Sequence, residues 1–143
     1  MKNGSFLFVA FLLVFSGCKN TPKPIAYGAD GCNFCSMTIV DRQHAAQYMT
    51  QKGRSYAFDA TECMLNQLKT IDAVKVGLYL VNDYDTPGEM IDATQATYLI
   101  SENIPSPMGE YLTAFATREA AQKAHDENGG TLYTWEQLNV HFN

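Results

Sequence analysis

The apolar pattern of this chain gives the order strand, helix, strand twice, and this repetition constrains the fold more than any single motif. In the first half, residues 54–60 alternate as in a half-buried strand, a helical pattern follows, and the apolar run 74–83 fits a buried strand. In the second half, strands are expected within 90–117 and a helix over 117–128, closed by two glycines. We therefore expect an α+β fold.

The two halves share further details. Phe58 and Phe115 each precede a helical pattern, and Glu62 and Glu119 each lie just inside one. Strand–helix alternation alone also recurs by chance, and these shared details are what favour a duplication. The sequence favours an α+β architecture built from two small, similar units.

Local patterns set the expected elements of the first unit. Residues 37–50 predict a strand, a polar turn and a second short strand. Asp59 is expected to cap the following helix, with Glu62 completing a capping box. The apolar face of this helix is expected to comprise Met64, Leu65, Leu68 and Ile71.

Near the C-terminus, in the second unit, residues 131–139 predict a strand and a last helical turn.

Residues 1–17 have the pattern of a signal peptide. One positive charge, on Lys2, precedes the apolar stretch 5–15, which is too short to span a bilayer as a permanent helix. The stretch runs into Phe-Ser-Gly-Cys, which resembles the lipobox at which bacterial lipoproteins are cleaved and lipidated. Cys18 is therefore the predicted lipidation site. The alternative is an ordinary cleavage site beside an unrelated cysteine, since Phe15 is an unusual residue for a lipobox.

The remainder of the chain divides into three segments. Residues 18–31 contain two prolines and two glycines without apolar periodicity, so we expect a lipid-anchored tether. The folded part is expected to comprise a first unit over 32–85 and a second over 86–143. Such a protein would be exported and located in the cell envelope, anchored by lipid to a bacterial membrane.

The charge balance excludes one class of partner. Without residues 1–17, which contain a single charged residue, the chain carries a net charge of −6, and no basic cluster interrupts its acidic composition. Such a surface does not attract nucleic acid. The sequence also contains no Ser-His-Asp order, no phosphate-binding glycine loop and no distinctive carboxylate pair, so nothing indicates an enzyme.

The motif Cys-Asn-Phe-Cys-Ser-Met places Cys32, Cys35 and Met37 close together in an exported chain. A structural disulfide suits the oxidising compartment but leaves Met37 without a role. A thioredoxin-like site requires the pair at a helix start, whereas β-favouring residues 38–40 follow it. Zinc requires further Cys or His ligands, and Cys63 stands alone in the sequence. Copper(I) remains, because it prefers thiolate and thioether sulfur.

Distant residues could complete a copper site. Met108 lies between proline and glycine on an expected loop, where an apolar side chain without a task is unusual, so it is a candidate ligand. Cys63 could either pack in the core or face the metal. His44 is a further candidate, although an isolated histidine is more often a surface residue. Met64 shares the apolar helix face and is expected in the core.

Four blocks of sequence resemble the NosL family, accessory lipoproteins of nitrous oxide reductase. These are the cysteine segment CNFCSMTI, YAFDATECML, SPMGEYLTAFATREAAQKA and NGGTLYTWEQL, in the family's order. The resemblance implies a lipid-anchored copper(I) chaperone that faces the periplasm and passes copper to nitrous oxide reductase while its copper–sulfide centre is assembled. It also implies a pair of homologous ββαβ units.

The resemblance assigns roles to particular residues. It implies that Cys35 and Met108 are copper ligands, with Met37 as a further ligand and Cys32 as a second thiolate. The family usually has glycine where this chain has Ser36, so a backbone conformation suited to glycine is in question there. The alternative function is an extracytoplasmic thiol–disulfide protein, or a disulfide-stapled binding module, that uses Cys32 and Cys35.

Overall fold

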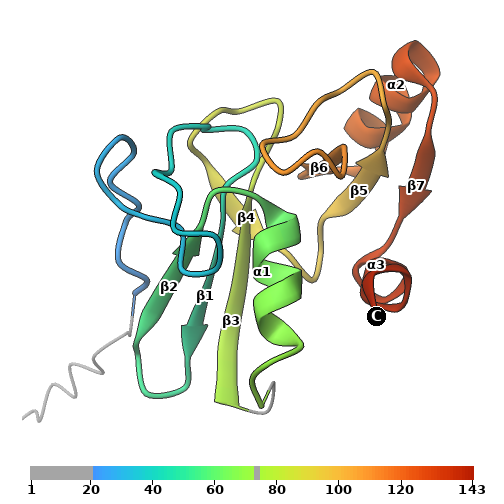
Figure 1. Cartoon of the computed structure of the whole chain (residues 1–143). Coiled ribbons are helices and arrows are strands. Elements are labelled where there is room, and N and C mark those ends of the chain that lie inside the picture. The colour runs from blue at the N-terminus through green and yellow to red at the C-terminus, as the bar shows by residue number, and fades with distance from the viewer. Residues whose placement is uncertain (1–20, 73–74) are drawn as a thin grey trace, which may run out of the picture.

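The computed structural model describes residues 21–72 and 75–143, which form two small antiparallel sheets accompanied by helices (Figure 1). The elements of the first sheet and its helix are β1 (Ala46–Thr50), β2 (Ser55–Phe58), α1 (Thr61–Leu68), β3 (Val76–Asn82) and β4 (Met90–Asp92). Those of the second are β5 (Thr97–Ile100), β6 (Leu112–Phe115), α2 (Arg118–Asn128), β7 (Thr131–Tyr133) and α3 (Trp135–Phe142). The expected α+β class is confirmed.

The two sheets share one topology over three strands each, and the first sheet has β4 in addition. The strand order is β2-β1-β3-β4 in the first sheet and β6-β5-β7 in the second. In each, a hairpin is followed by a helix and by a third strand that pairs with the hairpin's first strand. This is the expected pair of similar ββαβ units. The division after residue 85 stays a prediction; β4, which lies beyond it, pairs with β3 in the first sheet.

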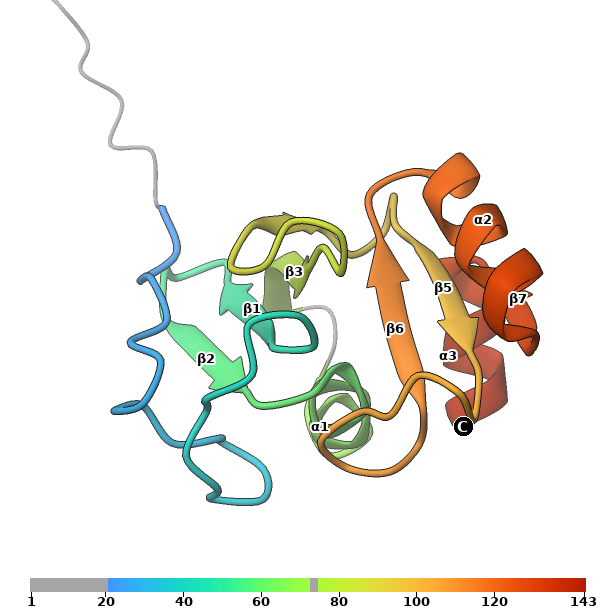
Figure 2. The same ribbon diagram turned by 90° about the horizontal axis from the view of Figure 1, so that it is seen from above.

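A shared core joins the two sheets. Figure 2 shows α1 between the first sheet and β6. Buried side chains from both halves contribute to this core, including Phe58, Met64, Tyr98, Leu112 and Leu138. Met64 is thus a core residue, as expected from its helical position. A smaller cluster under α2 is built around Leu99 and Phe115.

The N-terminal part of the described chain packs against the first sheet. Side chains alternate across β1, so Tyr48 faces the core while Gln47 points to the opposite face. On that opposite face, Gln47 Nε2 donates to the carbonyl of Lys23 at 2.7 Å, and the amide of Lys23 donates to Ser55 Oγ. The described part of the segment predicted as a tether therefore forms an added layer on the sheet.

Two local expectations were wrong. Residues 37–40 form no strand; only an isolated bridge joins Gly31 to Thr38. Helix α1 has Ala60 at its N-cap position and no side-chain cap. Asp59 and Glu62 were predicted to cap this helix, but both accept hydrogen bonds from other side chains. Asp59 accepts from Cys35, and Glu62 accepts from Ser106. Neither carboxylate therefore caps the helix.

The C-terminal helix is longer than the single turn expected. Helix α3 spans eight residues and begins with a capping box, in which Thr134 and Gln137 satisfy each other's backbone amides. Its Leu138 is fully buried, so packing against the core stabilises the helix beyond its first turn. Among the helices of the described residues, none is long and apolar enough to cross a membrane.

Candidate metal centre

The loop of residues 31–38 holds Cys32 and Cys35 in a tight turn. The amide of Cys32 donates to the carbonyl of Met37 at 2.7 Å, and the amide of Ser36 donates back to the carbonyl of Cys32 at 3.0 Å. Ser36 has φ of +67°, in the left-handed region. The conformation usually reserved for glycine is thus present here, although the residue is serine.

Hydrogen bonds fasten this loop to β2. The backbone amide and the side-chain amide of Asn33 both donate to the carbonyl of Ala57, at 2.9 and 3.0 Å. The chain then continues from β2 through Asp59 into α1, whose first turn contains Cys63. The loop, the junction between β2 and α1, and the helix start therefore converge on one point (Figure 2).

Four side chains meet at this point: Cys32, Cys35, Asp59 and Cys63. One potential ligand atom from each lies within 4.8 Å of all the others. Cys32, Asp59 and Cys63 are buried, while Cys35 is partly exposed, and Cys35 Sγ donates to Asp59 Oδ1 at 3.4 Å. We call this group the thiol cluster. Within 21–72 and 75–143 it is the one grouping of three or more Cys, His, Asp or Glu side chains placed to hold a metal ion.

The thiol cluster favours ionisation of one particular sulfur. A hydrogen bond from the thiol of Cys63 lowers the pKa of Cys32 to about 6, against the effect of burial. The same pairing raises the pKa of Cys63, and burial raises the pKa of Cys35. Since a thiolate is the form that binds metals, the hydrogen-bonded pair of Cys32 and Cys63 favours a state with one ionised sulfur that can receive a cation.

The donor set suits a soft ion. A metal–thiolate bond is about 2.3 Å long, so sulfurs that share one ion lie within about 4.6 Å of one another, close to the observed spacing. Three thiols match the preference of copper(I), whereas three thiols with a carboxylate also satisfy the four-coordinate preference of zinc. The sequence argument that Cys63 stands alone is wrong in three dimensions, because the fold brings it to Cys32 and Cys35.

The two methionines predicted as ligands lie at the surface. Met37 is 53% exposed and Met108 is 37% exposed. Met37 follows Cys35 by two residues in the same turn, and Met108 lies on the loop between β5 and β6. That loop is attached to α1, because Ser106 donates a hydrogen bond to Glu62. Their part in binding a metal stays a prediction.

His44 has a structural position outside the thiol cluster. Its side chain is buried, its Nδ1 lies 3.0 Å from Asp41 Oδ2, and its Nε2 lies 3.4 Å from Thr113 Oγ1. The ring also packs edge-on against Tyr84. The expectation of a surface histidine was therefore wrong, since these contacts hold the ring in the interior.

Asp59 is the member of the thiol cluster that sequence reasoning missed as a candidate for the site. It looked like a helix cap, and nothing in the local pattern distinguishes a capping carboxylate from one turned toward a distant loop. The sequence did offer Cys63 as a candidate that could either pack in the core or face the metal, and the structure places it in the thiol cluster. Cys18, the predicted lipidation site, lies outside the described residues.

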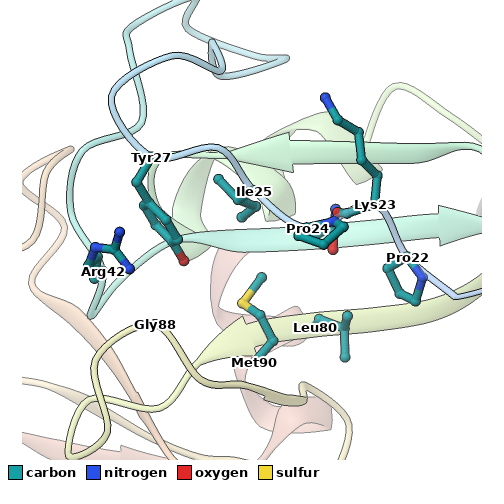
Figure 3. Close-up of a pocket in the computed structure, with 10 residues that line it drawn as sticks. Pro22, Lys23, Pro24, Ile25, Tyr27, Arg42, Leu80, Gly88 and Met90 are labelled. Atoms are coloured by element: carbon teal, nitrogen blue, oxygen red, sulfur yellow. The ribbon is translucent and has the colours of Figure 1, made fainter.

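A separate cleft of about 480 Å³ lies between the N-terminal segment and strands β3 and β4 (Figure 3). Leu80 and Met90 line its floor, and Tyr27 lies at its edge with the guanidinium of Arg42 4.5 Å from its ring centre. The cleft contains none of the predicted metal ligands, so the thiol cluster is the better candidate for chemistry.

Comparison with known proteins gives consistent results. The family model described as NosL matches residues 25–142. A copper-binding lipoprotein NosL from Stutzerimonas stutzeri is 26% identical, over 94% of this chain and 80% of its own length. The crystal structure of the copper chaperone NosL from Shewanella denitrificans has the same fold. It superposes with a TM-score of 0.72 at 20% identity and covers 82% of this chain and 95% of the other.

Proposed function

Since this chain belongs to the NosL family, we propose that it binds copper(I) and delivers it for assembly of the copper–sulfide centre of nitrous oxide reductase. The observation that carries the proposal is the thiol cluster, in which two loop cysteines and a helix cysteine lie within reach of one ion. Thiolate sulfur selects a soft ion such as copper(I). The two relatives reported above are named for copper binding or copper chaperoning, and neither name describes a reaction.

The proposed cargo site uses sulfur of both kinds. Cys35 is the central ligand, because its thiol is partly exposed and lies in the thiol cluster. Cys32 supplies a second thiolate. Met37 and Met108 supply thioethers at the surface, where both side chains are accessible to a partner protein. A site that mixes these ligands holds copper(I) without demanding a complete cage.

Delivery then proceeds by ligand exchange. Copper(I) is satisfied by two or three ligands, so a sulfur or imidazole of the recipient can bond to it before the first ligand leaves. Partial exposure of Cys35 leaves room for this approach. The acidic surface of the chain favours a recipient with a basic or neutral docking patch, where charge pairing mainly raises the rate of encounter.

The proposed location follows from the N-terminal sequence and from the relative named as a lipoprotein. Lipid on Cys18 would hold the protein at a bacterial membrane, with the folded part facing the periplasm. The folded part begins to contact the first sheet at Lys23, so few residues separate the anchor from the domain. Labelling cells with a radioactive fatty acid tests the anchor, because Cys18→Ser should abolish incorporation.

An anaerobic copper(I) titration of the reduced protein, against a chelator of known affinity, tests the cargo. We expect about one ion per chain, held through thiolates and lost in Cys35→Ser. A transfer assay then tests the recipient: copper-loaded protein should restore the copper–sulfide centre of copper-free nitrous oxide reductase faster than free copper does. If the wild-type protein cannot compete with the chelator for copper(I), the proposed function is wrong.

A second function is favoured by the same sulfur spacing. Thiols this close can oxidise in pairs, so Cys32 and Cys35 could form the disulfide of a thiol–disulfide protein or a stapled binding module. This alternative predicts no free thiol at either residue in the exported protein. Mass analysis after alkylation separates the two, because a stable pair reacts only after reduction.

A further inference from the structure

Cys63 is the most buried sulfur of the thiol cluster. It lies in the first turn of α1 with 1% of its surface exposed, beside Cys32 at 4%. The sulfur atoms proposed for delivery lie at the surface by contrast, with Met37 more than half exposed. Cys35 is intermediate between these two groups. The sulfur ligands therefore form an inner and an outer set, and Cys35 can belong to both.

A second observation indicates that the inner set accommodates a cation. Asp59 is 3% exposed, and its Oδ2 has no hydrogen-bond partner among the described residues. A buried carboxylate oxygen without a partner is costly, because it has lost water and gained nothing in return. A metal ion held among the adjacent sulfurs offers this carboxylate a partner, because a ligand atom of Asp59 lies within 4.8 Å of all three sulfurs.

We propose that Cys32, Cys35 and Cys63 form a buried three-thiolate position in which copper(I) rests before it moves outward through Cys35 to the exposed methionines. This inference rests on the proposed function, since copper(I) is the cargo. Burial keeps water and oxidants from the resting ion. Three thiolates also hold it more firmly than the outer set, so release requires a partner that offers new ligands.

The outward step changes bonds and leaves the oxidation state unchanged. A bond from copper to an incoming thioether forms, and the bond to the Cys63 sulfur breaks. That sulfur then takes a proton from water, and copper remains copper(I) throughout. Cys35 stays bonded during the exchange, so the ion is never without a thiolate.

X-ray absorption at the copper edge tests the resting position in the reduced protein loaded with one equivalent of copper(I). The proposal expects three sulfur neighbours at one short distance in the wild type and two in Cys63→Ser. Affinity measured by chelator competition should fall at least about 10-fold in Cys63→Ser, since losing a direct ligand should cost no less than losing a group that orients one. The matched control is Met64→Leu, which replaces a buried sulfur on the same helix and should change neither result.

The possible outcomes separate this inference from the proposed function. If copper(I) binding requires Cys35 but is unchanged in Cys63→Ser, the proposed chaperone function remains supported. The buried three-thiolate position is then wrong. Two sulfur neighbours in the wild type overturn it as well, and that measurement does not depend on whether a variant folds. Retained zinc that copper(I) cannot displace would make the cluster a zinc site. No competition for copper(I) by the wild type removes the function itself.

Discussion

Glu62, in the first turn of α1, accepts a hydrogen bond from Ser106, which lies 44 residues further along the chain in the loop that carries Met108. The carboxyl group is almost fully buried, and burial raises its pKa. Its Oε2 has no hydrogen-bond partner within the described part of the chain. The contact attaches the loop that carries Met108 to the helix that supplies Cys63.

Replacing Ser106 by alanine should destabilise the protein by about 1–3 kcal/mol, because a buried carboxylate oxygen then loses its hydrogen bond. Urea unfolding of the metal-free protein measures the change. Glu110→Gln on the same loop is the control, since its side chain is exposed and its replacement should alter stability by less than about 0.5 kcal/mol. Equal effects of the two substitutions would show that the buried contact contributes nothing.

Replacing Met108 by leucine should leave the fold intact and weaken copper(I) binding. The two side chains have similar volumes, and this one is partly exposed, so unfolding by urea should change little. The thioether is lost, however, and leucine offers no ligand atom. Met49→Leu is the control, because Met49 is a buried methionine of β1 that is not among the proposed ligands. Unchanged chelator competition in Met108→Leu would exclude that residue from the site.

The sequence predicted the parts of this fold that depend on local pattern. Apolar periodicity located α1, α2 and the strands around them, because a helix or strand that packs on a core carries that period in its own residues. It failed at residues 37–40, where β-favouring side chains follow a turn whose hydrogen bonds close on Cys32 instead of pairing with a strand. At these residues the hydrogen bonds of the loop outweigh the β propensity of the side chains.

The candidate site also contains residues that the sequence predicted and residues that it did not. The pair Cys32 and Cys35 could be found from spacing alone, since both lie in one turn. Asp59 and Cys63 lie beside this pair because the chain leaves β2 next to the cysteine loop and begins α1 there. No local sequence pattern predicts this long-range contact. His44 was misjudged for the same reason: its partner Thr113 lies 69 residues away.

Ser36→Gly should stabilise the cysteine loop. Ser36 has φ of +67°, a conformation that costs a residue with a side chain about 1–2 kcal/mol and costs glycine little. Greater freedom of glycine in the unfolded chain offsets part of the gain, so we expect a net increase of up to about 1 kcal/mol in the free energy of unfolding. Ser36→Val should be clearly destabilising, because a β-branched residue fits this conformation poorly. The reverse order in urea unfolding would contradict the assigned backbone.

Gly130→Ala and Gly129→Ala should differ sharply, although both glycines have positive φ values. A Cβ at Gly130 would lie 2.2 Å from the carbonyl oxygen of Ile100, whereas one at Gly129 would meet nothing within 4 Å. We expect a loss of about 1 kcal/mol for Gly129→Ala from backbone strain alone, and several times that for Gly130→Ala, where backbone must move. Thermal unfolding of both variants measures the difference, and similar midpoints would argue against the close approach of β5 to this turn.

The contact between Asp41 and His44 should make stability depend on acid pH. Burial of Asp41 opposes its ionisation, but hydrogen bonds from His44 and Gln43 outweigh it and hold the pKa below the usual value of 3.8. The unfolded carboxylate therefore binds its proton more tightly than the folded one. The resulting stabilisation is fully present above pH 3.8 and is lost as the pH falls through the folded pKa.

Asp41→Asn should consequently lower the free energy of unfolding near neutral pH by on the order of 1 kcal/mol, because the side chain is one-third exposed and solvent screens part of the interaction. The difference in the free energy of unfolding between this variant and the wild type should decrease as the pH is lowered below 3.8, because the carboxyl group of Asp41 in the wild type also becomes neutral there. Urea unfolding at pH 7 and pH 3 measures both values. Asp85→Asn, at an exposed aspartate, is the control and should follow the wild type at both. A gap in Asp41→Asn that is the same at pH 7 and pH 3 would mean that the shape of the side chain matters here and its charge does not.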